Sequence, residues 1–220
     1  MRIFLASAKL DDIRWAGEHG LADGVLTTPA LLAEAADDGD GRGLLADLCR
    51  STALPVCATV NAVNGADIYR DGRDLAKLAD HVIVQIPLVE DAVHAIRKLS
   101  AEGVRVGATL VFNAAQAILA AKAGASMVAT ALDQLDAYGQ DGLGAVAELR
   151  AVFSDGRMEC DVLALAPQDA TQFAGCAVAG ADAVSVTPSL LRRLLLHPLT
   201  DRGLDQFMSE LARGKSGRHA

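Results

Sequence analysis

Short apolar runs alternate with amphipathic segments along the whole of this chain. The runs are rich in β-branched residues and stop at turn-forming residues, which is typical of buried strands, and the segments between them carry apolar residues at helical spacing. The pattern therefore predicts eight strands, each followed by a helix. The predicted strands are Arg2–Ser7, Gly24–Thr27, Pro55–Thr59, His81–Gln85, Arg105–Thr109, Met127–Thr130, Glu159–Leu165 and Ala183–Val186.

Glycines mark the ends of several predicted helices. Gly20, Gly103, Gly124 and Gly180 each stand a few residues before a predicted strand. Many helices end on a residue in the left-handed conformation, which glycine adopts without a steric penalty. These four positions therefore predict where a helix gives way to a strand.

Eight strand–helix units in 220 residues predict an α/β fold, the (β/α)8 or TIM barrel. Right-handed crossovers place successive parallel strands side by side, and closure of such a sheet gives the barrel. A doubly wound open sheet is the alternative, but the first strand–helix turn lacks the glycine fingerprint of dinucleotide-binding sheets. We expect the barrel to span residues 1–196, followed by a C-terminal helical extension and tail over residues 197–220.

One strand carries a polar residue where a barrel would hold its chemistry. The run His81–Pro87 is apolar apart from Gln85, which lies near its C-terminal end. Strand side chains alternate, so His81, Ile83 and Gln85 share one face. Functional groups of a parallel barrel lie at the C-terminal ends of the strands. Gln85 is therefore the expected position of a reactive group, although an amide is not reactive.

An amphipathic segment follows the eighth predicted strand. Its apolar residues recur at helical spacing and are Leu204, Phe207, Met208 and Leu211. Thr200 or Asp201 is the expected N-cap of this helix. Beyond a finished barrel such a helix either folds back or packs on a neighbouring subunit, and the polar tail Gly214–Ala220 is expected to fray.

Composition excludes some partners. The formal net charge is -8 and no basic stripe appears, so we expect no nucleic acid. No stretch approaches the ~18 consecutive apolar residues of a membrane span, so we expect no membrane association. The four cysteines lack metal-type spacing, which favours a reduced, cytoplasmic compartment.

The loop Asp38–Gly41 is the one stretch that suggests a metal. Its alternating aspartates and glycines are similar to part of a calcium loop, but the remaining ligands and the flanking pattern are missing. A solvated turn between two short helices is the simpler interpretation. We expect no metal site and no cofactor.

Five stretches together carry a family resemblance: Gly24–Pro29, Ala108–Ala117, Ala121–Ala125, Leu135–Asp136 with Gly139–Gly142, and His197–Asp201. On these residues the sequence resembles the transaldolase family, in the short subgroup that includes fructose-6-phosphate aldolase. The resemblance covers essentially the whole chain. It implies a TIM barrel whose terminal helix packs on a neighbour in a homo-oligomeric ring, a pentamer or a decamer of two stacked rings.

The resemblance also implies a class I aldol cleavage or transfer. In such enzymes a lysine on the fourth strand forms a Schiff base with the substrate carbonyl. Here Gln85 occupies that lysine position, and an amide nitrogen cannot form a Schiff base. The lysines that are present fall on predicted helices, loops or the tail, and none lies at a predicted strand end. They are Lys9, Lys77, Lys98, Lys122 and Lys215.

Other positions that the resemblance assigns to the site are neutral as well. The replacements are Ala6 for an aspartate that helps proton transfer, Thr28 for an asparagine, Gln134 for a phosphate-holding arginine, and Ala166 and Gln168 for a serine and a basic residue. Thr109 on the fifth strand is retained. The barrel frame is thus kept, while the charged catalytic set is replaced by uncharged residues.

Eight polar residues remain as candidates for the barrel mouth. We predict Gln85, Asp133 and Thr109 as catalytic candidates, and Thr28, Thr59, Asn61, Gln134 and Gln168 as substrate-binding candidates. Asp133 is their only carboxylate and the best acid or base; a helix-capping aspartate is the alternative. A buried amide such as Gln85 needs partners for its donor and its acceptor, and a small-molecule ligand could supply them.

Two functions stay open. The first is a diverged transaldolase-like enzyme that has lost class I activity and uses the pocket for lysine-independent chemistry on a small, largely neutral metabolite. The second is a non-catalytic homologue that binds a metabolite or a protein partner. A pocket that is open and polar would favour the first function, and one filled by side chains would favour the second.

Overall fold

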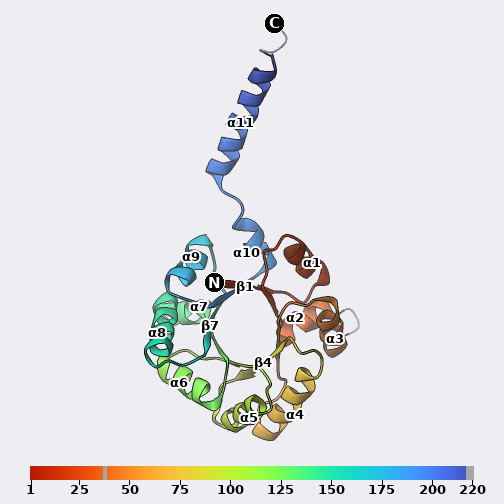
Figure 1. The fold of residues 1–220 in the computed structure, drawn as a ribbon, viewed down its shortest axis with the longest axis vertical. Helices are drawn as coiled ribbons and strands as arrows, with labels where there is room; N and C mark the ends of the chain where they lie inside the picture. Colours follow the sequence, from red (N-terminus) through yellow and green to blue (C-terminus); the bar gives the residue numbers. More distant parts are fainter. Residues whose placement is uncertain (37–38, 217–220) are drawn as a thin grey trace. The chain divides into compact units, whose positions relative to one another are not determined.

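The structure is a computed structural model that describes residues 1–36 and 39–216. Eight parallel strands close into a barrel in the order β1 to β8, and the helices form a ring outside them (Figure 1). This confirms the predicted TIM barrel. The strands are β1 (Arg2–Ala6), β2 (Gly24–Leu26), β3 (Val56–Thr59), β4 (Val82–Pro87), β5 (Val106–Thr109), β6 (Met127–Ala131), β7 (Asp161–Leu165) and β8 (Ala183–Val186).

Closure of the sheet joins its first and last strands. Arg2 of β1 pairs with Ala183 of β8, and Leu5 pairs with Val186, so every strand has a neighbour on both sides. The strands that were predicted are all present, but some of their ends differ. The fourth begins after His81 and continues through Pro87, because Ile86 and Pro87 still pair with β5. Gln85 therefore lies two residues before the end of β4.

Helices follow the strands on the outside of the barrel. They are α1 (Leu10–Glu18), α2 (Pro29–Ala35), α3 (Gly41–Ser51), α4 (Gly65–Ala76), α5 (Glu90–Ala101), α6 (Ala114–Ala123), α7 (Leu132–Ala137), α8 (Gly142–Asp155) and α9 (Ala170–Val178). All four glycines predicted to end helices have positive φ: Gly20, Gly103, Gly124 and Gly180. Their left-handed conformation confirms the helix-to-strand turns predicted from the sequence.

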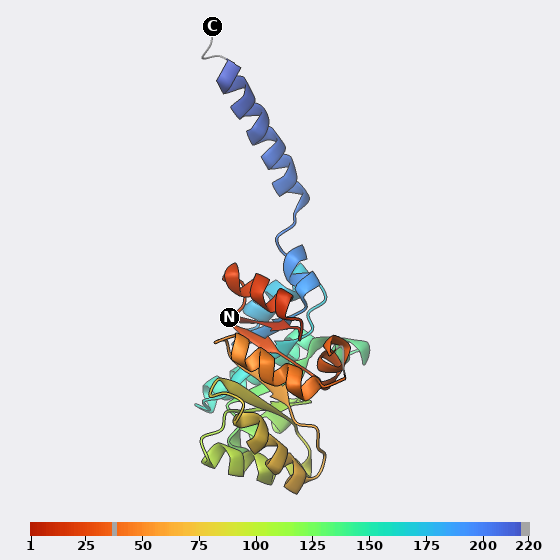
Figure 2. The same ribbon diagram turned by 90° about the vertical axis from the view of Figure 1, so that its right-hand side faces the viewer.

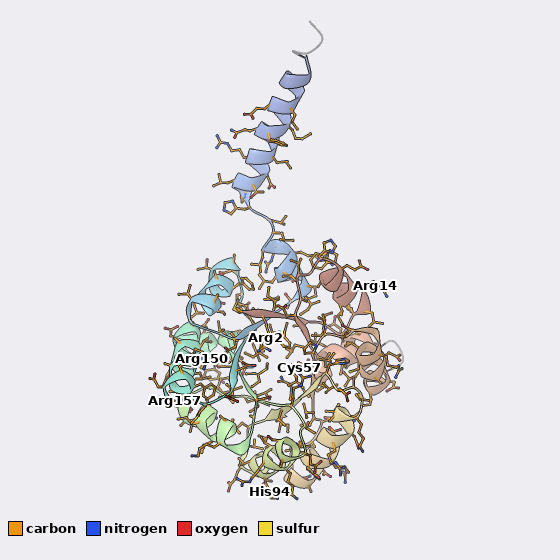
Figure 3. The ribbon with its side chains drawn as sticks, viewed as in Figure 1. Arg2, Arg14, Cys57, His94, Arg150 and Arg157 are labelled. Carbon is orange, nitrogen blue, oxygen red and sulfur yellow. The ribbon has the colours of Figure 1, made fainter. Side chains whose placement is uncertain are left out.

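The barrel interior is filled by apolar side chains. Its core cluster consists of Phe4, Leu26, Cys57, Ile83, Met127, Ala129, Leu163 and Ala183. Figure 3 labels Cys57 on the wall of this interior. Gly24 is needed beside Phe4, since a Cβ at position 24 would lie 2.4 Å from the Phe4 ring. The barrel is therefore a packed core, and any ligand site must lie at its mouth.

The chain divides into two compact units, residues Met1–Pro188 and Ser189–Ala220. Most of α10 (Pro188–Arg193) and all of α11 (Pro198–Ser216) belong to the second unit. Figure 2 shows α11 as one uninterrupted helix. None of the helices within the described residues has the length and apolar character needed to cross a membrane.

Two expectations for the C-terminal segment are corrected. The N-cap is not Thr200 or Asp201, because α11 begins at Pro198 and His197 Nδ1 accepts a hydrogen bond from the Leu199 N–H at 3.1 Å. Proline suits the first helical position, where its missing N–H costs nothing. The helix also continues through Ser216, so the predicted tail is helical from Gly214 to that residue. Residues 217–220 lie outside the described part of the chain.

Candidate functional site at the barrel mouth

Strand ends bring the first group of candidates together. Thr59 of β3 pairs in register with Gln85 of β4, and Gln85 pairs with Gly107 of β5. Thr109 lies two residues further along β5 and pairs with Pro87. Because Ile83 points into the core, strand alternation directs Gln85 inward as well. Gln85, Thr59 and Thr109 therefore belong to one part of the mouth.

Gln85 is buried with an unmet hydrogen-bonding need. Its residue exposure is 1%, and its Nε2 has no hydrogen-bond partner among the described residues. The amide extends over Gly107, where an added Cβ would lie 2.8 Å from Nε2. A buried donor without a partner costs free energy, and a ligand that accepts a hydrogen bond from this amide would remove that cost.

Cys57 lies next to Gln85 and is an unreactive neighbour. Burial raises the pKa of its thiol to about 12, and the nearby Gln85 amide only partly offsets this effect. A hydrogen bond from the Gln85 amide would stabilise the Cys57 thiolate, yet Gln85 Nε2 makes no hydrogen bond to the described residues. Since the thiolate is the nucleophile, Cys57 stays in its inert thiol form near neutral pH.

Threonine hydroxyls around the mouth are used in local structure. The Thr27 hydroxyl donates to the Cys57 carbonyl at 2.8 Å, and the Thr59 hydroxyl approaches the Thr27 carbonyl at 3.5 Å. Thr28 Oγ1 accepts a hydrogen bond from the Leu31 N–H at 3.2 Å, so Thr28 is the N-cap of α2. Thr59 and Thr109 remain partly accessible and can still contact a ligand.

The other polar candidates lie on the loops and helices of the rim. Asp133 in the first turn of α7 is exposed, and its Oδ1 accepts a hydrogen bond from the Gln134 N–H. Gln168 is exposed and donates through Nε2 to the Ala166 carbonyl at 2.8 Å. The Asn61 N–H donates to Asp71 at 2.7 Å. These rim residues are tied to their own segments and not to Gln85.

The side chains that point inward at the strand ends of the mouth are uncharged. The inward-facing residues near the C-terminal ends of the eight strands are Ala6, Leu26, Thr59, Gln85, Thr109, Ala131, Leu165 and Ser185, and none carries a charge. Lys9, in the loop after β1, pairs with Glu34 at the surface with an Nζ–Oε1 distance of 3.3 Å. The remaining lysines are Lys77 at the end of α4, Lys98 in α5, Lys122 in α6 and Lys215 in α11.

Three cavities surround the mouth. One of about 270 Å³ includes Thr59 and Asn61, and one of about 370 Å³ lies between the loops after β3 and β4. A third, of about 340 Å³, is lined by Phe112, Gln134, Leu135, Tyr138 and Gln140. Gln85 lines none of these three. Sequence reasoning selected Gln134 but missed Phe112, Tyr138 and Gln140, although all three stand within motifs that carry the family resemblance or next to one.

Two backbone positions at the mouth are strained. Leu110, directly after β5, has φ 57°, and Ala166, directly after β7, has φ 56°. Residues with a Cβ rarely adopt this left-handed conformation, and such outliers cluster at binding sites. Leucine and alanine are not residue types that indicate a left-handed backbone conformation, so the strain at these two positions could not have been predicted from the sequence.

The loop Asp38–Gly41 is the stretch whose sequence is similar to part of a calcium loop. Asp40 accepts a hydrogen bond from the Gly43 N–H at 2.8 Å and is the N-cap of α3. Asp38 of the suggested calcium loop lies outside the described residues. Within residues 1–36 and 39–216, no group of three or more metal-ligating side chains comes together.

These features define the class of protein, a TIM barrel with a neutral mouth and an added C-terminal helix. The protein family described as Transaldolase/Fructose-6-phosphate aldolase matches residues 3–216. The chain is 37% identical over 213 residues to a protein of Hyphomonas neptunium named probable transaldolase, and the match covers 96% of each chain.

Other relatives carry the same name. A probable transaldolase of Kosmotoga olearia is 36% identical over 217 residues, with 99% of each chain covered. One from a Caulobacter species is 37% identical over 215 residues, which cover 96% of this chain and 97% of that protein. The chain therefore belongs to the transaldolase/fructose-6-phosphate aldolase family.

Proposed function

We propose that this transaldolase-family protein does not carry out Schiff-base aldol chemistry and that its barrel mouth holds a small, largely neutral metabolite. The observation that carries the proposal is Gln85: a buried amide with a free donor stands where the family resemblance expects the reactive lysine. A ligand carbonyl or hydroxyl oxygen can accept from such a donor, whereas an amide cannot form a covalent adduct with a carbonyl.

A neutral ligand is favoured by the absence of charge around Gln85. The inward strand-end residues on both sides, Thr59 and Thr109, offer hydroxyl groups only. Tight phosphate capture generally uses arginine or lysine, and at the two positions where the resemblance expects basic groups Gln134 and Gln168 offer amides. A substrate phosphate would find no cation among these residues.

Lysine-independent chemistry is the second candidate function. Asp133 favours it, because its carboxylate stands just beyond the end of β6 and only its Oδ1 is used in a hydrogen bond to the described residues. Non-catalytic binding is the other outcome. Profiling of cellular metabolites against the purified protein would find the ligand, and assays for its turnover by wild type and Asp133→Asn would separate the two.

The test of the main proposal is borohydride trapping. We expect no reduced covalent adduct when the protein is incubated with dihydroxyacetone or fructose 6-phosphate and then treated with sodium borohydride, as read by intact-mass spectrometry. A class I aldolase with its Schiff-base lysine serves as the positive control. A stable adduct on any lysine of this chain would refute the proposal.

Two further parts of the proposal concern the cellular location and the oligomeric state of the protein. We propose a cytoplasmic location, which the four unpaired, buried cysteines support. We also propose a homo-oligomer, which the exposed apolar residues of α11 support. The resemblance implies a ring of five or two stacked rings.

A further inference from the structure

The N-terminal ends of the strands carry the charge that the mouth lacks. Strand side chains alternate, so a residue two positions before an inward-facing residue also points inward. This rule selects four polar residues at the N-terminal end of the barrel, which we call the barrel floor: Arg2, His81, Arg105 and Asp161. The barrel floor lies at the opposite end of the strands from Gln85 and the uncharged mouth.

One arginine of the barrel floor is neutralised and the other is not. An ion pair joins Arg2 Nη2 to Asp161 Oδ2 at 2.6 Å. The Arg105 side chain is exposed, and its one hydrogen bond to the described residues is a contact of 3.3 Å from Nη2 to the Asp80 carbonyl. No carboxylate in the described part of the chain pairs with it. The barrel floor therefore holds an uncompensated positive charge in a chain whose formal net charge is -8.

His81 is the second unsatisfied group of the barrel floor. Its Nε2 is buried and has no hydrogen-bond partner within residues 1–36 and 39–216. Val84 of β4 pairs with Val106 of β5, which sets Arg105 opposite Ile83, two residues from His81 on the same face. His81 and Arg105 are therefore diagonal neighbours on strands about 4.8 Å apart, within reach of an arginine side chain.

The positive charge of the barrel floor acts on the barrel interior. Burial raises the pKa of the Cys57 thiol to about 12, and the charges of Arg105 and Arg2 are among the smaller influences that lower it. Nearby carboxylates do not cancel this field, because alternation directs Asp80 away from the barrel floor and Glu102 forms an ion pair among the outer helices. A positive potential at a protein-lined end of the barrel concentrates anions there.

We infer that the barrel floor binds a small inorganic oxyanion, such as phosphate or sulfate, between Arg105 and His81. A guanidinium donates paired hydrogen bonds to such an ion, and an imidazole N–H at Nε2 adds another. Both groups then gain the partner that they lack, which removes the cost of the unsatisfied imidazole nitrogen.

Binding requires one side-chain movement. Since Nε2 of His81 is covered by protein, the imidazole has to turn toward Arg105 when the ion binds. The inference goes beyond the proposed function and does not depend on it, because the barrel floor and Gln85 lie at opposite ends of the barrel.

The experiment is isothermal titration calorimetry of the full-length protein with sodium phosphate and sodium sulfate, with sodium chloride at the same ionic strength as reference. We expect saturable binding of one phosphate or sulfate ion per chain and no saturable binding of chloride. Arg105→Ala should weaken binding by about tenfold or more, the effect of losing a charge-assisted hydrogen bond. His81→Phe should also weaken it, because the ion loses the imidazole donor.

The matched control is Arg97→Ala, which removes an exposed arginine of α5 that has no ion pair with any residue the structure describes. It should bind phosphate as the wild type does, and circular dichroism of each variant shows that the barrel is folded. Absence of saturable binding at millimolar phosphate, unchanged binding by Arg105→Ala, or equal losses in Arg97→Ala and Arg105→Ala would overturn the inference. None of these results bears on the borohydride test, since that test reads lysine adducts.

Discussion

Gln85 and Gly107 fit each other in size inside the barrel. An added Cβ at position 107 would lie 2.8 Å from Gln85 Nε2, 3.3 Å from its Cδ and 3.6 Å from Ile83 Cγ2. Real Cβ atoms do not approach other atoms as closely as the first of these distances. Because Gln85 is buried, its amide has little room to retreat. The residue at position 107 thus decides which side-chain conformations position 85 can adopt.

We expect Gly107→Ala to lower the free energy of unfolding by about 1–3 kcal/mol, the usual cost of overpacking. The cost should be smaller in a Gln85→Ala background, since the two sites are coupled. Urea denaturation measures the free energy of unfolding of Gly107→Ala in the wild-type and in the Gln85→Ala background. Gly17→Ala is the matched control: on α1 its Cβ would meet nothing within 4 Å, so stability should be unchanged or slightly higher. Wild-type stability of Gly107→Ala would contradict the close fit.

Restoring a lysine is a second change at the scale of one residue. We expect Gln85→Lys alone to give no useful cleavage of fructose 6-phosphate. A Schiff-base lysine needs a lowered pKa and a proton shuttle nearby, and Ala6, Thr28 and Gln134 supply neither a carboxylate nor a cation. A coupled assay for the released triose phosphate measures the activity. Rates similar to those of family members would show that the neutral replacements matter less than proposed.

At the scale of elements, six of the described helices begin with a side-chain cap, whereas α1, α5 and α7 have none. In each of the six an oxygen of the N-cap side chain accepts from the N–H three residues later. The capping residues are Thr28, Asp40, Asn64, Asn113, Asp141 and Asp169. These residues fix where each loop at the mouth ends, and so they set the positions of the loop residues that line the cavities.

Removing one cap should have a measurable cost. We expect Asp141→Ala to destabilise the protein by about 1 kcal/mol, because the Gly144 N–H at the start of α8 loses its acceptor. Thermal unfolding followed by circular dichroism detects this. Asp155→Ala at the other end of α8 is the control and should be neutral or slightly stabilising, since a negative charge there opposes the helix dipole. Equal effects of the two substitutions would argue against capping.

The elements were predictable because their patterns are local. Apolar runs and helix-ending glycines located all eight strands, and the caps at Thr28 and Asn113 are of residue types that sequence alone favours. Strand ends were less predictable, since β4 reaches Pro87 only through its pairing with β5. The start of α11 was misplaced because the imidazole of His197 serves as the cap.

The candidate site was less predictable than the fold. Strand register brought Thr59 near Gln85, as alternation implies, but the glycine opposite, Gly107, has no side chain to draw attention in a sequence. The cavity lined by Phe112, Tyr138 and Gln140 depends on how two loops approach each other, and tertiary packing of that kind leaves no periodic signal. Tyr138 is an exposed aromatic after a short helix, which is a weak hint of binding.

At the scale of the whole molecule, α11 carries an uncovered apolar stripe. Leu204, Phe207, Met208 and Leu211 are each between 45% and 58% exposed. Burial of such side chains stabilises an assembly by roughly 1.5–3 kcal/mol each before ordering costs. Contiguous apolar patches of this kind mark interaction sites. A second copy of the chain is the partner that the family resemblance implies.

We expect the full-length protein to be oligomeric at micromolar concentration and a chain cut after Pro198 to form smaller species, because the cut removes the stripe. Light scattering coupled to size exclusion gives both masses. The control is a chain that ends at Ser216, which keeps the stripe and should assemble as the full-length protein does. A full-length monomer whose helix packs on its own barrel would contradict this prediction.

The pairing of Arg2 with Ala183 has a consequence for how the protein is made. During synthesis the first strand is made well before its second neighbour, β8, because the other six strands come between them. Until then the growing sheet has two open edges, which can pair with other chains. Contacts so distant in sequence also form slowly. We therefore expect the nascent barrel to depend on chaperones late in synthesis, and a ribosome-bound chain that ends before β8 to be far more prone to aggregation than one that includes it.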